Sequence, residues 1–278
     1  FNPFKPILTA QHNNRDHRKI AVVDGIYGFT GGINLADEYI NALDKYGHWK
    51  DTAIMLEGEA VWSLTVMFLS MWDYLQNTNT DFNGYKPKYD TLNVVSDGFI
   101  QPFADNPLDN EPVGETVYMN IINKARKYVY IYTPYLIADN ELVCALTIAA
   151  KSGIDVKIIT PHIADRRFVH TVTRAYYQIL LEAGVEIYEY KPGFMHAKTF
   201  AADDEYAVVG SINLDYRSFY LHFESAVWIY HSSCIQDIKK DFLDTLTLCK
   251  KITLEECRAE KTHIKLARAA LRAFAPLM

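Results

Sequence analysis

The sequence has few cysteines and no long apolar run. Four cysteines in 278 residues, with no Cys-x-x-Cys pair, are too sparse for the disulfide framework of a small secreted domain, so we expect a reducing, cytosol-facing compartment. No stretch reaches the roughly 18 apolar residues that a transmembrane helix needs, and the first residues lack the pattern of a secretory signal. These absences predict that this chain contacts a membrane only peripherally.

The chain also lacks an excess of basic residues. It has 28 Lys and Arg against 34 Asp and Glu, which gives a formal net charge of -6. Nucleic-acid-binding domains normally carry a basic field that attracts phosphates, so we expect no nucleic-acid partner. The length exceeds that of a usual single domain and predicts one large or two medium α/β domains.

What the sequence does contain is an internal repeat. Residues 17–34 read HRKIAVVDGIYGFTGGIN, and residues 196–213 read HAKTFAADDEYAVVGSIN. Both segments carry a histidine, a lysine, an aspartate, a glycine and an asparagine at the same offsets, without a gap. One such match would be weak, but two copies with the same following glycine and asparagine are specific.

Apolar patterns around the second copy predict alternating strands and helices, and therefore a sheet covered on both faces. We expect strands at 128–134, 154–160 and 185–190, helices at 140–152 and 168–183, a turn at 191–194 and a motif strand at 195–201. In the first half, a helix is expected at 59–75.

Only 16 residues precede the first copy, so we expect the chain to begin inside its first repeat. Polar and proline-containing stretches at 76–88 and 96–114 are interpreted as loops between the halves. The predicted domains are therefore residues 1–98 and 99–278.

Each motif places an imidazole beside an ammonium group, because residues two apart on a strand point to the same face. His17 with Lys19, and His196 with Lys198, suit an anionic phosphodiester: lysine binds the non-bridging oxygens, and a neutral imidazole can attack phosphorus. One histidine must be neutral to attack while the other is charged to protonate the leaving alkoxide, so their environments must differ.

Other residues are predicted to support these four. Amide donors from Asn34 and Asn213, and close backbone approach at Gly32 and Ser211, would bind the substrate, although Gly32 and Ser211 can also be plain turn residues. Each histidine needs a partner on its second ring nitrogen, and the candidates are Asp51 and Glu224, which follow their motifs on expected strands. A salt bridge or a polar edge position is the alternative for both carboxylates.

Asp24 and Asp203 complete the two motifs, and we interpret them as turn-forming residues that support the site more than as reacting groups. The other histidines, including His222, show no metal-ligand spacing, so we assign no metal and no cofactor. Tyr135 and Asp139 fit a substrate entrance or, equally, a core tyrosine and a helix N-cap.

The repeated HxKxxxxD pattern resembles the signature of the phospholipase D superfamily. The wider text, including GFTGGINLADEY, TPYLIADNE and GSINLDYRSFYLHFE, is similar to bacterial cardiolipin synthases over nearly the whole chain. The resemblance implies two similar α/β/α halves related by a pseudo-twofold axis, the first truncated at its N-terminus. It also implies metal-independent transfer through a phosphohistidine, usually with the first histidine, here His17, as the nucleophile.

The resulting functional expectation is a cardiolipin synthase that transfers a phosphatidyl group between two phosphatidylglycerols and releases glycerol. Phospholipase D hydrolysis and, less favoured, a metal-independent nuclease remain alternatives, because the first half-reaction is shared. The resemblance places the catalytic part at the cytoplasmic side of the bacterial cell membrane. The tail 261–278 is expected to form a helix that docks on the domain or contacts anionic headgroups.

Overall fold

A nine-stranded mixed sheet forms the centre of the protein in the computed structural model, which describes residues 14–89 and 97–273. Its main order is β1-β15-β13-β12-β7-β9-β10-β16, and β6 also pairs with β15. The strands are β1 (Arg15–Asp16), β6 (Phe99–Asp105), β7 (Tyr128–Tyr132), β9 (Asp155–Pro161), β10 (Glu186–Tyr190), β12 (Thr199–Ala202), β13 (Tyr206–Gly210), β15 (His222–Tyr230) and β16 (Cys249–Lys251).

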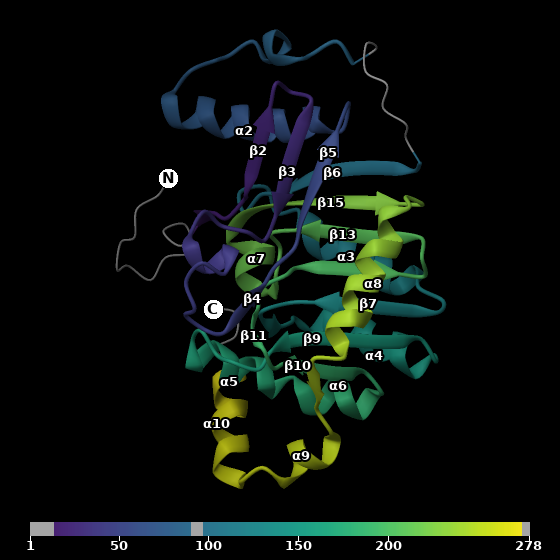
Figure 1. The fold of residues 1–278 in the computed structure, drawn as a ribbon. Coiled ribbons are helices and arrows are strands. Elements are labelled where there is room, and N and C mark those ends of the chain that lie inside the picture. Colours follow the sequence, from purple (N-terminus) through teal and green to yellow (C-terminus); the bar gives the residue numbers. More distant parts are fainter. Residues whose placement is uncertain (1–13, 90–96, 274–278) are drawn as a thin grey trace.

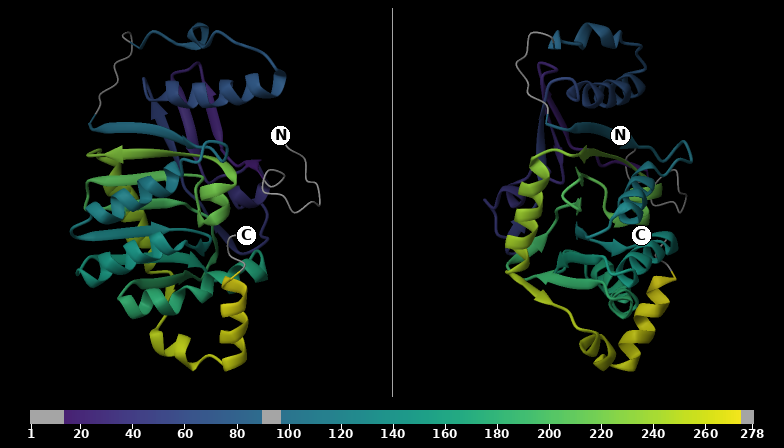
Figure 2. Two further views of the ribbon diagram at one scale, coloured as in Figure 1. Left: turned by 180° about the vertical axis from the view of Figure 1, so that it is seen from behind. Right: turned by 90° about the vertical axis from the view of Figure 1, so that its right-hand side faces the viewer.

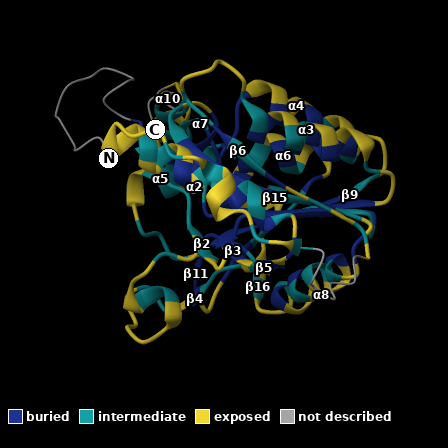
Figure 3. Ribbon diagram, turned by 90° about the horizontal axis from the view of Figure 1, so that it is seen from above, coloured by how far each residue is buried: buried dark blue, intermediate teal, exposed yellow. Residues whose placement is uncertain are grey.

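Helices cover both faces of this sheet (Figures 1 and 2). On one face lie α3 (Val113–Lys124), α4 (Asn140–Lys151), α5 (Arg167–Ala175) and α6 (Tyr177–Ala183), and on the other lies α8 (Cys234–Leu246). Tyr118 of α3 stacks on Phe200 at 4.0 Å between ring centroids, and Phe242 of α8 stacks on Tyr130 at 4.8 Å. Burial is greatest in the strands between these layers (Figure 3). The predicted α/β fold is confirmed.

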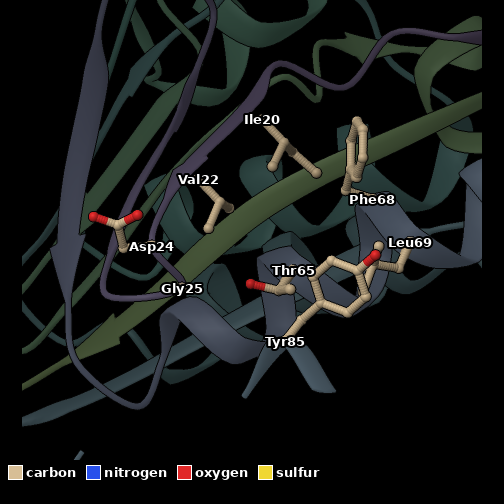
Figure 4. A pocket seen from close by; sticks show the side chains of 8 residues that line it. All are labelled: Ile20, Val22, Asp24, Gly25, Thr65, Phe68, Leu69 and Tyr85. Atoms are coloured by element: carbon tan, nitrogen blue, oxygen red, sulfur yellow. The ribbon is translucent and has the colours of Figure 1, made fainter. Parts of the chain in front are cut away.

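The first half forms a smaller antiparallel sheet of β2 (Ile20–Val23), β3 (Tyr27–Gly31) and β5 (Ala53–Glu57), packed on α2 (Val61–Gln76). Leu56 and Leu64 pack here in one buried cluster with Val209 and Val227 of the large sheet. The expected helix at 59–75 is thus confirmed. A pocket of about 310 Å³ lies between β2 and α2, and Asp24 lines one end of it (Figure 4).

The motif strands of the two halves repeat each other at an offset of 179 residues. β2 and β3 correspond to β12 and β13, residue for residue, and β5 corresponds to β15. The outer face of the small sheet is exposed at Val23, Phe29 and Met55, whereas the equivalent face of the second half lies beneath α3. The pseudo-twofold relation therefore holds for the motif strands, while their outer surroundings differ.

Several predicted elements differ from the structure. The motif strand begins only at Thr199, because β11 (Gly193–Met195) pairs with β4 (His48–Lys50) of the first half and the motif segment 196–198 connects two sheets. The helix expected at 168–183 is divided at Tyr176, whose amide bonds the oxygen of Thr173 in a tighter turn. The loop expected at 96–114 contains β6, where Pro102 is tolerated because β6 is an edge strand.

The boundary at residues 98 and 99 remains a prediction, and residues 90–96 lie outside the described part. η2 (Phe82–Tyr85) lies in the polar stretch at 76–88. Near the C-terminus, α9 (Leu254–Ala259) precedes α10 (Thr262–Arg272), and Arg272 of α10 lies 4.6 Å from the Tyr176 ring, so the helix docks on the domain. Within residues 14–89 and 97–273, none of the helices has the length and apolarity needed to cross a bilayer.

Candidate active site

Two parallel strand pairs bring the halves together around the motifs. β1, directly before the first motif, pairs with the start of β15, and β11, directly before the second motif, pairs with β4. The amide of His17 donates to the oxygen of Phe223 at 2.9 Å, and that of His196 donates to the oxygen of Lys50 at 2.7 Å. Each histidine is therefore anchored next to the carboxylate residue of the opposite half.

The histidine–carboxylate pairs are crossed as a result, which means that each histidine pairs with a carboxylate of the other half. Nδ1 of His17 lies 3.0 and 2.9 Å from the two carboxylate oxygens of Glu224, and Nδ1 of His196 lies 2.7 Å from Oδ2 of Asp51. Both carboxylates are almost fully buried. Because Nδ1 faces a carboxylate in each pair, we assign the hydrogen to Nδ1, which leaves Nε2 as the reactive nitrogen.

The two motif lysines lie beside the histidines and reach back to them. The ammonium of Lys19 donates to the carbonyl oxygen of His17, and that of Lys198 donates to the carbonyl oxygen of His196. Burial lowers the pKa of Lys19 to about 8 and that of Lys198 to about 7, although Asp51 and Glu224 raise both. Since each lysine responds to both carboxylates, these groups form one electrostatic cluster and not two separate sites.

The surroundings of the two histidines differ. His196 is enclosed by aromatic rings, with centroids of Trp49 at 5.1 Å and Tyr39 at 5.4 Å, and its side chain is 9% exposed against 26% for His17. Burial lowers the pKa of His196 to about 4, helped by the charges of Lys198 and His17 and opposed by Asp51. His196 is thus a neutral imidazole near pH 7.

Both carboxylates stay ionised despite their burial. Burial alone would raise the pKa of Asp51, but the hydrogen bond from His196 and the charge of Lys198 hold it below its ordinary value. The same balance, with His17 as the main partner, holds the pKa of Glu224 well below its usual range. An ionised carboxylate behind each imidazole can stabilise the positive charge that develops on the ring.

The two residues that follow the motif strands contact these carboxylates differently. Ser211 donates its hydroxyl to Glu224. At the equivalent position Gly32 has no room for a side chain, because a Cβ there would lie 2.1 Å from Oδ1 of Asp51. Both residues also donate their amides across the sheet, to Ser225 and Thr52 respectively, at 2.9 Å. They therefore shape the carboxylate pockets, and their role in substrate binding stays a prediction.

The motif asparagines and aspartates lie in different surroundings. Asn34 donates to the hydroxyl of Tyr39, and Asn213 contacts the Ser218 hydroxyl at 3.1 Å, while its Oδ1 atom is buried without a partner in the described chain. Asp203 accepts the amides of residues 126, 127 and 128 at 2.6 to 2.9 Å, which fixes the start of β7. Asp24 is exposed in a turn with φ of 54° and lines the pocket between β2 and α2. Asp203 thus has a structural role and Asp24 occupies a turn, and among the described residues neither aspartate contacts a histidine.

His222 lies beside the first catalytic histidine, which the sequence did not indicate. Its two ring nitrogens are buried and have no hydrogen-bond partner among the described residues, and its ring lies 5.7 Å from that of His17. Nδ1 lies 3.6 Å from Oε1 of Glu224. The ligand atoms of His17, His222 and Glu224 lie within 4.8 Å of one another and could hold a metal ion. Such an ion would compete with the His17–Glu224 hydrogen bond, so we assign no metal to the reaction.

Some site residues carried only a weak sequence signal. Tyr39 and Trp49 belong to no repeated motif, although Trp49 directly precedes Lys50 and Asp51. Tyr135 donates its hydroxyl to Asp165 at 2.6 Å, and Asp139 caps α4 by accepting the Leu142 amide at 2.9 Å. The N-cap alternative for Asp139 is therefore confirmed.

Comparison with known proteins matches this arrangement. Residues 118–246 match the family described as cardiolipin synthase, PLD-like domain. A protein named cardiolipin synthase from Alkalihalophilus pseudofirmus is 38% identical over 279 residues, covering 100% of this chain and 55% of that protein. Residues 118–246 thus match a phospholipase D-like domain, and the whole chain is similar to cardiolipin synthases. It spans little more than half the length of such curated relatives.

Two further relatives align with this chain over a similar share of their own length. An uncharacterized protein of Streptococcus mutans is 51% identical over 281 residues and is 60% covered, and cardiolipin synthase 2 of Bacillus anthracis is 37% identical over 276 residues and is 53% covered. Their alignments include 100% and 98% of this chain. The crystal structure of phosphatidylserine synthase from Haemophilus influenzae has a TM-score of 0.71 at 16% identity, covering 95% of this chain and 71% of that structure, and shows the shared fold.

Proposed function

We propose that the protein containing this chain is a cardiolipin synthase that moves a phosphatidyl group from one phosphatidylglycerol to another and releases glycerol. The observation that carries the proposal is the pair of crossed histidine–carboxylate contacts with two lysines in one electrostatic cluster. Two imidazoles in unequal surroundings supply the attacking nitrogen and the acid that phosphoryl transfer requires. The relatives named cardiolipin synthase support a phospholipid substrate.

An apolar cavity next to the site supports a lipid substrate. It measures about 510 Å³, borders Lys19 and Asn34, and is walled mainly by apolar side chains, among them Phe29, Ile33 and Leu35. A phosphate held by Lys19 would place an attached acyl chain against this wall, where apolar contact is favourable. The exposed Leu35 and Ile40, which is part of η1 (Asp37–Ile40), are suited to peripheral contact with a bilayer on the cytoplasmic side.

The proposed reaction has two displacement steps. Nε2 of one histidine attacks phosphorus, the P–O bond to glycerol breaks, and the other histidine donates a proton to the departing alkoxide. In the second step that histidine removes the proton from a hydroxyl of the acceptor phosphatidylglycerol, whose oxygen attacks phosphorus while the P–N bond breaks. The resemblance predicts His17 as nucleophile, but the neutral state of the buried His196 favours His196 in this role.

The test uses the full-length protein with vesicles that contain phosphatidylglycerol. We expect release of glycerol and formation of a four-chain lipid, both abolished by His17→Ala and by His196→Ala. Phosphatidic acid as sole lipid product would show a hydrolase, and cleavage of DNA without turnover of lipid would show a nuclease.

A chromogenic phosphodiester with a good leaving group separates the two histidines, because such a group departs without an acid. If His196 attacks, His17→Ala retains a burst of product and a base-stable phosphohistidine at position 196. A burst retained by His196→Ala instead would restore the order implied by the resemblance.

A further inference from the structure

A group of arginines from three separate elements lies at the edge of the active site. Arg15 is in β1, Arg166 directly precedes α5, and Arg217 is in α7 (Tyr216–Tyr220). Arg15 is the register partner of His222, and α7 packs against β15, which begins at His222. Arg15 therefore lies beside His222 in the sheet, and the helix that carries Arg217 packs against the same strand.

The residue directly before Arg166 lies on the side of the other catalytic histidine. This residue, Asp165, accepts the hydroxyl of Tyr135 at 2.6 Å and acts electrostatically on Tyr39, whose ring contacts that of His196. The segment that carries Arg166 thus lies on the His196 side of the site, whereas Arg15 lies on the His17 side.

These positive charges are close enough to repel one another. Burial lowers the pKa of Arg217 despite the opposing charge of Asp215, and the charges of Arg166 and Arg15 lower it further. Bringing like charges together in a partly buried place costs free energy unless an anion is bound between them. The arrangement therefore resembles a binding site more than a stabilising contact.

The carboxylates next to Arg166 and Arg217 are engaged by other groups. Within the described residues, Arg166 and Arg217 have no ion pair with a carboxylate. Asp165 accepts a tyrosine hydroxyl and a backbone amide, and Asp215 accepts the Ser218 amide at 2.7 Å. Arg217 is half-buried, so its guanidinium is held in the fold while keeping donors for a ligand.

We propose that Arg15, Arg166 and Arg217 form a subsite for a second phosphodiester, that of the acceptor phosphatidylglycerol, beside the phosphorus that is transferred. This inference rests on the proposed function. The acceptor differs from water and from simple alcohols because its own phosphate lies one glycerol unit away from the attacking hydroxyl. Guanidinium groups bind phosphate oxygens through paired hydrogen bonds, so they would position this hydroxyl for attack.

The test measures how the full-length protein divides its products between two acceptors. Vesicles of phosphatidylglycerol are incubated with 1-butanol, an acceptor without a phosphate, and the ratio of four-chain lipid to phosphatidylbutanol is determined. For Arg217→Gln we expect this ratio to fall about 10- to 100-fold, which is the usual effect of losing a charge-assisted contact. Release of glycerol, which reports the first step, should be nearly unchanged.

Three further variants provide a second test position, a conservative replacement and a control. Arg166→Gln changes an exposed side chain, so it should fold normally and lower the ratio in the same direction. Arg217→Lys should restore part of the ratio because it returns the charge without the planar fork. Arg258→Gln removes the same charge from an exposed position on α9 and should leave the ratio unchanged.

The proposal is overturned if Arg217→Gln and Arg166→Gln keep the wild-type ratio, or if both acceptors lose product equally. If the wild-type protein releases no glycerol and makes no four-chain lipid, the proposed function itself fails. Cleavage of DNA that weakens in Arg217→Gln would assign the second phosphate to a nucleic acid and would overturn the lipid subsite.

Discussion

Each catalytic histidine depends on a carboxylate from the opposite half, and substitution of the carboxylates tests this directly. Asp51→Asn and Glu224→Gln keep the size and shape of the side chain but remove its negative charge. The 2.7 Å contact of Asp51 with His196 is a buried, charge-assisted hydrogen bond, for which about 1.5–3 kcal/mol is expected. Since about 1.4 kcal/mol is a factor of ten in rate, Asp51→Asn should slow the step carried out by His196 by roughly 10- to 150-fold.

The assay is single-turnover kinetics with two substrates, phosphatidylglycerol and the chromogenic diester with a good leaving group. With His196 as nucleophile, Asp51→Asn should slow the release of both leaving groups. Glu224→Gln, which acts on His17, should slow the release of glycerol far more than that of the chromogenic group, since only glycerol needs an acid.

Unfolding free energies give an independent measure of the pairing. In double-mutant cycles, Asp51→Asn should couple to His196→Ala by about 1–3 kcal/mol, but to His17→Ala by about 0.5 kcal/mol or less, because the latter pair makes no direct contact. Strong coupling of Asp51 to His17, the motif histidine of the same half, would refute the crossed arrangement.

Three more predictions concern residues around this pair. Because burial lowers the pKa of Lys19 to about 8 and of Lys198 to about 7, kcat/KM for phospholipid should fall as pH rises through 7 to 8 and the phosphate-binding charges are lost; a profile flat to pH 10 would contradict this. Gly32→Ala should lower transferase activity about tenfold or more with native circular dichroism, since its Cβ would displace the Asp51 carboxylate. Asp203→Asn should lower the free energy of unfolding by about 2–4 kcal/mol in urea titrations, yet leave the activity per folded molecule unchanged, because its carboxylate bonds three backbone amides.

The repeat was the part of the fold that the sequence predicted well. The match of residues 17–34 to 196–213 has no gap, and the structure keeps the same register, with Ile20 and Gly31 equivalent to Thr199 and Gly210. Long apolar strands and amphipathic helices of the second half were also predictable, since their periodicity is set by burial against one core.

The crossed pairing could not be predicted from sequence. Glu224 lies 207 residues from His17, and Asp51 lies 145 residues from His196. Nothing local in either segment indicates that β1 joins β15 or that β4 joins β11, because short parallel strands carry almost no pattern of their own. The position of His222 beside His17 could not be predicted for the same reason, since the two residues come from distant parts of the chain.

The unequal roles of the two motifs follow from what surrounds them and not from the motifs themselves. Both motifs supply a histidine, a lysine and the same backbone path. His196, however, lies among aromatic rings and pairs with an aspartate. His17 is more exposed, pairs with a glutamate and lies beside His222. The residues that create this difference are largely exchanged between halves, since Asp51, Tyr39 and Trp49 of the first half enclose the histidine of the second. A half on its own would therefore keep its motif but lose the carboxylate that holds its imidazole, and a complete pair of acid and nucleophile exists only where both halves meet.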